Sequence, residues 1–140
     1  MNTPRSHSRT LFEKIFDRDV IVTRESGDAL LFIDRHLIHD LHYRAFEELQ
    51  ATGRTIRYPD QLFATPDHSV PTTAKKLTDI PQGEMRDTVA GLKGAAERIG
   101  FAHLDMTDPR HGIFNVIGHE KGITIPGLTL VCGESHTSTP

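Results

Sequence analysis

The sequence has little of several features that would assign it to a class of protein at once. Its one cysteine, Cys132, excludes an intrachain disulfide, and a reducing compartment, the cytoplasm, is therefore the expected location. Its longest apolar runs, such as residues 29–33, are far shorter than the ~20 residues that a membrane-spanning helix needs. The 16 Lys and Arg residues are nearly balanced by 19 Asp and Glu residues, which argues against a nucleic-acid-binding protein. No G-x-G-x-x-G or Walker sequence occurs, so the common nucleotide-binding loops are excluded.

What remains is an ordinary globular composition, with 36% hydrophobic and 25% charged residues among 140. This length suits one domain. Residues 1–9 are polar and basic, and we predict a flexible tail there. Residues 10–140 are expected to form the domain.

The apolar residues alternate between helical and extended patterns. Helices are predicted over residues 11–17, 42–51 and 84–99, and the last carries a clean apolar stripe that ends at Gly100. Extended segments are predicted over residues 20–23, 62–65, 101–104, 123–126 and 128–132, with a buried strand over 29–33. Strands that alternate with helices predict an α/β fold, a layered sheet with flanking helices.

Acidic residues and histidines gather where three of these extended segments end. The groups are Asp34/His36/His39, Asp67/His68 and Glu134/Ser135/His136. Ligands of α/β folds bind beyond the carboxyl ends of strands, so these groups predict one convergent polar site. Histidine is the side chain most easily tuned for proton transfer near neutral pH. The alternative is that they are solvated loop residues that cap the strands.

Other kinds of site find less support. His36 and His39 have a spacing seen in zinc sites, but no HExxH or paired-cysteine pattern occurs, and we assign no residue to a metal. Ser135 lacks the G-x-S-x-G elbow of serine hydrolases. Cys132 lies in an apolar run, which predicts a buried, inert thiol.

Five short segments, in order, resemble one known family. They are Leu11 to Phe16, Phe32 to Asp40, Phe63 to His68, Gly83 to Met85, and Ile125 to Thr137. Together they resemble the N-terminal part of the 3-isopropylmalate dehydratase large subunits, in the aconitase superfamily. The resemblance covers nearly the whole chain after residue 9. It implies an aconitase-type N-terminal domain that is truncated, because the family's large subunits are several times longer.

The resemblance also implies an activity. The family isomerises 2- and 3-isopropylmalate by dehydration and rehydration, in leucine biosynthesis. Its substrates are small hydroxy-dicarboxylates, its cofactor is a [4Fe–4S] cluster, and a separate small subunit carries the swivelling domain. The cluster's cysteines lie downstream of the segment matched here, and Cys132 is not one of them. We therefore expect the isolated chain to be inactive. The alternative is a non-catalytic truncated remnant, or a fragment that binds another subunit.

Carried over by position, the resemblance assigns roles to individual residues. Asp67 and His68 match an Asp-His pair of the acid/base network, and Ser135 and His136 match a catalytic Ser-His. His39 and Glu134 fall at substrate-binding positions. Two departures matter: Glu134 replaces the usual Asp, and Asn115 replaces a catalytic His, for which His119 is a possible substitute. They raise the odds of a changed substrate or a lost activity.

Overall fold

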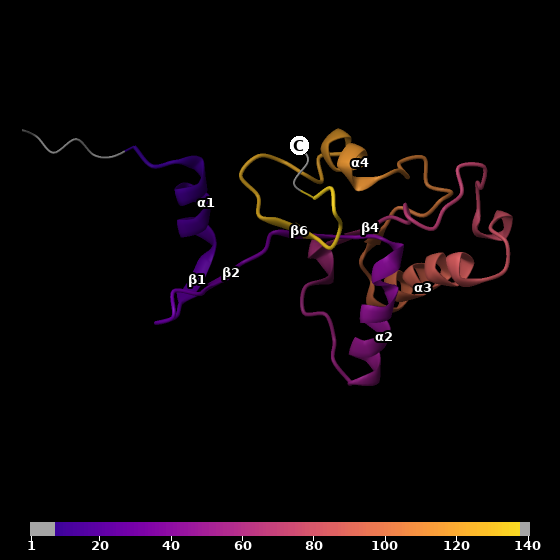
Figure 1. Ribbon diagram of the computed structural model, residues 1–140, viewed down its shortest axis with the longest axis horizontal. Coiled ribbons are helices and arrows are strands. Elements are labelled where there is room, and N and C mark those ends of the chain that lie inside the picture. Colours follow the sequence, from indigo (N-terminus) through magenta and orange to yellow (C-terminus); the bar gives the residue numbers. More distant parts are fainter. Residues whose placement is uncertain (1–7, 138–140) are drawn as a thin grey trace, which may run out of the picture.

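A four-stranded parallel sheet organises the fold in the computed structural model, which describes residues 8–137 (Figure 1). Its strands are β3 (Arg35–Ile38), β4 (Leu62–Ala64), β5 (Ala102–His103) and β6 (Leu130–Cys132), in the order β5-β4-β3-β6. Every neighbouring pair is parallel. The predicted α/β class is confirmed, as are the strands within residues 62–65, 101–104 and 128–132. Of the predicted tail, residues 1–7 lie outside the described part.

The strand β3 contributes to a core on each face of the sheet, because successive side chains of a strand point in opposite directions. Ile38 packs with α2 (Tyr43–Ala51) and α3 (Glu84–Ile99), through Phe46 and Leu92. Leu37 packs on the opposite face with α4 (Phe114–Glu120), through Phe114 and Ile117. The sheet is thus covered by helices on both faces. Short 3-10 turns at Asp40–His42, Pro59–Gln61 and Leu77–Asp79 complete the regular structure.

The helix α3 begins and ends where the sequence predicts. The middle of its apolar stripe is buried, with Val89 and Leu92 almost inaccessible to solvent, whereas Met85 at its start is exposed. It ends at Gly100, whose φ of 89° is a left-handed conformation that favours glycine. Among residues 8–137, no helix combines the length and the hydrophobicity needed to cross a bilayer.

Two glycines of α3 should respond in opposite ways to alanine. A Cβ at Gly91 would lie 2.5 Å from Cδ2 of Tyr43 on α2, whereas one at Gly94 would meet nothing within 4 Å. We expect Gly91→Ala to destabilise the protein by about 1–3 kcal/mol through overpacking. Gly94→Ala should stabilise it by up to about 1 kcal/mol, because alanine is the better helix former. Urea unfolding of the two variants measures both changes in the free energy of unfolding. Equal changes would show that α2 and α3 do not pack so closely at Gly91.

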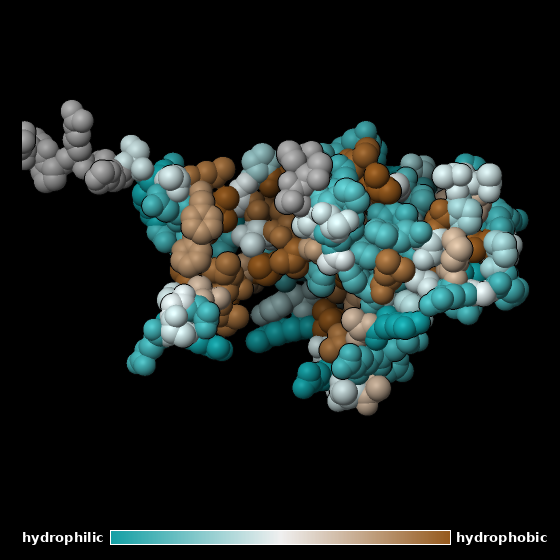
Figure 2. All heavy atoms as spheres, viewed as in Figure 1, coloured by the Kyte–Doolittle hydropathy of each residue, from teal (hydrophilic) through white to brown (hydrophobic). Residues whose placement is uncertain are grey.

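An N-terminal arm extends away from the sheet (Figure 1). It comprises α1 (Leu11–Asp19) and an antiparallel hairpin of β1 (Val20–Thr23) and β2 (Ala29–Leu31). Apolar side chains such as Phe12 and Ile21 are 72% and 62% exposed, and Figure 2 shows apolar surface on the arm. Within the predicted buried strand over 29–33, a strand forms at Ala29–Leu31, but it is not buried, because Leu30 is 56% exposed. An apolar run does not reveal its pairing, and the turn at Gly27 pairs this one with β1 rather than with the main sheet.

Salt bridges and hydrogen bonds attach the arm to the body. The Arg18 guanidinium contacts the carboxylates of Asp19 and Asp34, and Asp34 accepts a 2.9 Å hydrogen bond from the Thr129 N–H. The prediction that Asp34 and His36 follow the end of a core strand is therefore wrong. Asp34 precedes β3, and His36 lies within that strand. Of the predicted group Asp34/His36/His39, only His39 therefore lies at the carboxyl end of a strand of the main sheet.

Candidate functional site

The carboxyl ends of three adjacent strands bring the predicted polar groups together. His39 follows β3, Asp67 and His68 follow β4, and Glu134 to His136 follow β6. A cavity of about 420 Å³ is lined by His39, Asp67 and Glu134. A neighbouring cavity of about 310 Å³ is lined by Asp67, His68, Glu134 and His136. Side chains from distant parts of the sequence therefore face shared cavities.

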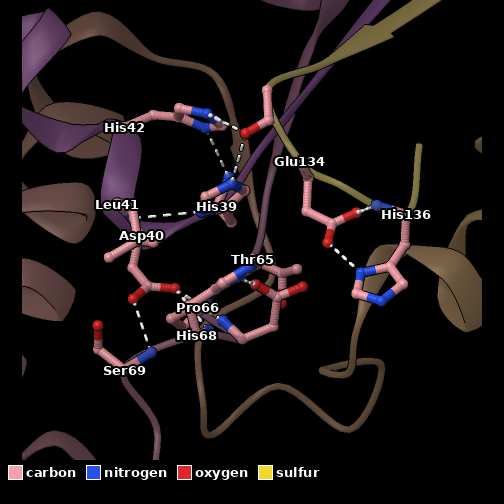
Figure 3. Close-up of polar contacts among 12 residues, drawn as sticks. His39, Asp40, Leu41, His42, Thr65, Pro66, His68, Ser69, Glu134 and His136 are labelled. Carbon is pink, nitrogen blue, oxygen red and sulfur yellow. Dashed lines mark hydrogen bonds and ion pairs between the residues drawn. The ribbon is translucent and has the colours of Figure 1, made fainter.

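Asp40 holds the loop that presents Asp67 and His68. Its carboxylate is completely buried, and its Oδ1 accepts hydrogen bonds from the backbone N–H groups of Asp67 (2.9 Å) and His68 (3.0 Å). Its Oδ2 accepts one from the Ser69 N–H (2.8 Å), as Figure 3 shows. Burial raises the pKa of Asp40, but these hydrogen bonds outweigh it, and the net pKa is lowered. Asp40 is therefore an anion that orders the loop after β4.

Asp67 and His68 form a close pair. Oδ1 of Asp67 lies 2.6 Å from Nδ1 of His68, and the Asp67 side chain is buried while that of His68 is 35% exposed. An ionised carboxylate can only accept, so Nδ1 of His68 carries the proton. This arrangement leaves Nε2 of His68 to give or take a proton on the cavity side. The structure thus provides the pair with the geometry that acid/base chemistry needs.

Three imidazoles, that of His68 among them, lie in contact: the His39 ring stacks on His68 and is tilted against His42. The ring centroid of His39 lies 3.9 Å from that of His42 and 4.0 Å from that of His68. Nδ1 of His39 accepts from the Leu41 N–H at 3.3 Å, so its protonated Nε2 faces the Gly133 carbonyl, also at 3.3 Å. Burial, and then the neighbouring His39, lower the pKa of His42. A neutral His42 can pack against His39 without charge repulsion.

The residues after β6, Glu134 to His136, contact one another. The Glu134 carboxylate accepts from the His136 backbone N–H at 2.6 Å and pairs with Nδ1 of the same residue (Figure 3). The bond to the His136 side chain, more than any other contact, lowers the pKa of Glu134. The Ser135 hydroxyl lies 3.2 Å from Nδ1 of His136. Glu134 thus orients His136, whose side chain is 72% exposed, and a substrate contact of Glu134 stays a prediction.

Gly133 and His42 fit together in a way that has a testable consequence. Nε2 of His42 lies 3.3 Å from the Gly133 oxygen, and a Cβ at Gly133 would collide with that nitrogen. We expect Gly133→Ala to displace His42 and destabilise the protein by about 1–3 kcal/mol. The double variant Gly133→Ala/His42→Ala should lose less than the sum of the two single variants. Urea unfolding of all three measures the coupling, and strict additivity would contradict the contact.

The helix α4 carries Asn115, which stands where the resembled family has a catalytic histidine, and His119, the possible substitute for that histidine. The Asn115 amide donates to the His136 carbonyl oxygen at 3.0 Å, so it ties α4 to the segment after β6. His119, one turn further along, lines the 420 Å³ cavity together with Asn115. His119 is therefore in the right cavity to act in place of a histidine at 115, and that role stays a prediction. The helix itself was not predicted, because its apolar residues are few in a seven-residue element.

Two contributors to the site were missed from the sequence. Asp40 could have been suspected, because it is next to His39, which the sequence had assigned to the site, two residues beyond the end of β3. The sequence placed His42 at an exposed helix start. In the structure the His42 ring packs at a tilt against His39, and its Nδ1 accepts from the His39 backbone N–H at 3.2 Å.

Comparison with known families agrees with this fold. The model of the aconitase family (aconitate hydratase) matches residues 13–140, nearly the whole chain. The chain therefore belongs to the aconitase family, whose members are iron–sulfur hydro-lyases that generally bind a [4Fe–4S] cluster. The predicted superfamily is confirmed.

The residues present do not fit that cluster. A [4Fe–4S] cluster is held by several cysteine thiolates, and the chain has one cysteine. Cys132 is partly buried at the end of β6, and burial raises the pKa of its thiol, which disfavours the thiolate that iron binds. Any chemistry that this chain performs by itself must therefore come from its own side chains.

Proposed function

We propose that this chain is the N-terminal part of a hydro-lyase that interconverts 2- and 3-isopropylmalate by dehydration and rehydration, in leucine biosynthesis. The observation that carries the proposal is the Asp67–His68 pair, which shares its cavities with His39, Glu134 and His136 in a chain of the aconitase family. The five segments that resemble 3-isopropylmalate dehydratase large subunits favour this substrate over others of the family.

The roles of the residues follow from their contacts. Nε2 of His68 gives a proton to the departing hydroxyl or takes one from water, while Asp67 holds Nδ1–H and stabilises the imidazolium. His136, oriented by Glu134 and next to the Ser135 hydroxyl, acts as a second proton relay. The Nε2–H of His39 donates to a substrate oxygen in place of its long bond to Gly133. A [4Fe–4S] cluster would add Lewis-acid chemistry in the assembled enzyme, where other cysteines would have to hold it.

The apolar part of the larger cavity supports a substrate with an alkyl substituent. Leu37, Phe114 and Leu128 line it together with the acids and histidines. Burying a branched alkyl group there gains free energy in proportion to the apolar area removed from water. A further carboxylate at the same place would be desolvated without a cation to pair with. This contrast favours isopropylmalate over a tricarboxylate.

The proposal includes a partner and a compartment. A small subunit with the swivelling domain would complete the active site, and the isolated chain is expected to be inactive. The cytoplasm is the compartment proposed, since a reducing environment keeps thiols and clusters intact.

The experiment begins with the intact mass of the protein purified from its native source, together with whatever co-purifies. A mass well above 15.7 kDa, or a co-purifying subunit that supplies cysteines, supports the proposal. That preparation is then assayed for dehydration of 3-isopropylmalate, with citrate as the comparison substrate. Turnover of citrate alone would overturn the proposed substrate.

A second candidate is a non-catalytic protein that binds another subunit. Asn115 in place of a catalytic histidine, Glu134 in place of aspartate, and the single cysteine favour it. The same experiment separates the two. A protein of 15.7 kDa that co-purifies with a subunit but lacks a cluster and turnover would establish this second function.

A further inference from the structure

The donor atoms at the carboxyl ends of β3 and β4 form a set suited to a single metal ion. One ligand atom each from His39, Asp40, Asp67 and His68 lie within 4.8 Å of one another. Imidazole nitrogen and carboxylate oxygen are the donors that zinc and other divalent first-row ions accept. The sequence did not indicate such a set, because its members come from two loops.

The charges of this cluster also favour a cation. Asp40 is fully buried and Asp67 nearly so, and both carboxylates lie beside histidines rather than beside lysine or arginine. Among the residues that the structure describes, neither cavity at this edge is lined by a lysine or an arginine. Two partly desolvated negative charges with no permanent cation nearby are complementary to a divalent ion.

The four residues are not equivalent as ligands. Both oxygens of Asp40 already accept backbone hydrogen bonds, so Asp40 positions the loop and adds negative charge. Oδ1 of Asp67 and Nδ1 of His68 lie 2.6 Å apart, so an ion that displaces the proton between them can be bound by both residues. The hydrogen bonds of His39 to Leu41 and Gly133 are both 3.3 Å, long enough to be readily exchanged for a metal bond.

The local packing permits the ligands to converge. The rings of His39 and His68 are already stacked with their centroids 4.0 Å apart. His39 is buried, whereas the His68 side chain is 35% exposed, so solvent can reach the ion from the His68 side. Three protein ligands with solvent at the remaining position match the open coordination of many zinc sites.

We propose that His39, Asp67 and His68 form a binding site for one divalent transition-metal ion of the Zn²⁺ type, with Asp40 as its outer support. Its ligands are side chains of this chain and include no cysteine. The proposal concerns binding and does not depend on the hydro-lyase activity proposed above.

The test is metal binding by the full 140-residue chain after removal of metals with a chelator. Zn²⁺ is titrated by calorimetry, and Co²⁺ is used as a spectroscopic probe of the coordinating atoms. We expect one equivalent of Zn²⁺ per chain and visible absorption bands from Co²⁺ bound to nitrogen and oxygen. His68→Asn and Asp67→Asn should each weaken binding by about tenfold or more, since even outer partners of a metal contribute this much.

The control variant is His119→Asn, which alters a histidine of the same cavity that lies outside the four-residue set. It should bind Zn²⁺ as the unaltered chain does. Far-ultraviolet circular dichroism of each metal-free variant shows whether it is folded, and His68 is exposed enough to be replaced without unfolding. Binding well below one equivalent, or unchanged in both His68→Asn and Asp67→Asn, would show an adventitious ion only and overturn the proposal. Because no substrate is present, this outcome is distinct from a failure of the proposed hydro-lyase function.

Discussion

Asp40→Ala is expected to destabilise the protein by roughly 3 kcal/mol or more, because it leaves the N–H groups of Asp67, His68 and Ser69 without their acceptor. Each buried donor that loses its partner costs about 1–3 kcal/mol. The loop after β4 would lose the contacts that order it, so the Asp67–His68 pair would be disturbed as well. Urea unfolding in a buffer that contains a chelator measures the change without a contribution from bound metal.

Asp60→Ala is the matched control, because Asp60 is an exposed acid on the 3-10 turn Pro59–Gln61. Replacing it should change the free energy of unfolding by less than about 0.5 kcal/mol. A loss below about 1 kcal/mol in Asp40→Ala would show that the buried carboxylate does not order the loop after β4.

The contribution of Asp40 should also depend on pH. Its pKa is lowered in the folded state, because the three backbone N–H groups favour the ionised carboxylate. A lowered carboxyl pKa stabilises the fold above the unfolded pKa, and this stability is lost as the pH falls through the folded value. The difference in unfolding free energy between the unaltered protein and Asp40→Ala should therefore be constant near neutrality and shrink below about pH 4. A difference that grew on acidification would have the wrong sign.

Asp67→Asn in the assembled enzyme is expected to lower kcat by about 10²- to 10⁴-fold, the usual contribution of a general acid/base. The amide cannot stabilise the His68 imidazolium, and it can present N–H₂ to Nδ1, which favours the wrong tautomer of the ring. The protein purified from its native source provides the reference rate, and variants are made in the same gene. KM should change much less than kcat, since Asp67 reaches the substrate through His68.

Asp60→Asn serves as the control for turnover, because Asp60 lies outside the cavities at the strand ends. A thermal melt of each variant separates a loss of activity from a loss of folding. If Asp67→Asn retained most of the original kcat, the acid/base role of the Asp67–His68 pair would be wrong.

Local sequence patterns predicted those helices and strands whose formation does not depend on which other segment they pair with. The helix α3 was predicted over its full length, since an apolar stripe and the terminal Gly100 are properties of the segment itself. The strand predicted as buried over residues 29–33 forms over 29–31 as part of the exposed hairpin, because hydrophobicity does not say which strand it pairs with. The helix α4 escaped prediction because seven residues hold too few apolar positions for a period to emerge.

The sequence alone determined the α/β class and the superfamily. It also supplied the candidate residues of the site, namely Asp67, His68, Ser135 and His136. They follow from local periodicity and from short segments that keep their order. The folded chain was needed to show that Asp40 orders the loop of Asp67 and His68, that His42 packs on His39 and Gly133, and that four N and O donors lie together. The physical reason is the parallel pairing of β3 with β4 and β6, which joins segments far apart in sequence and places their carboxyl ends at one edge.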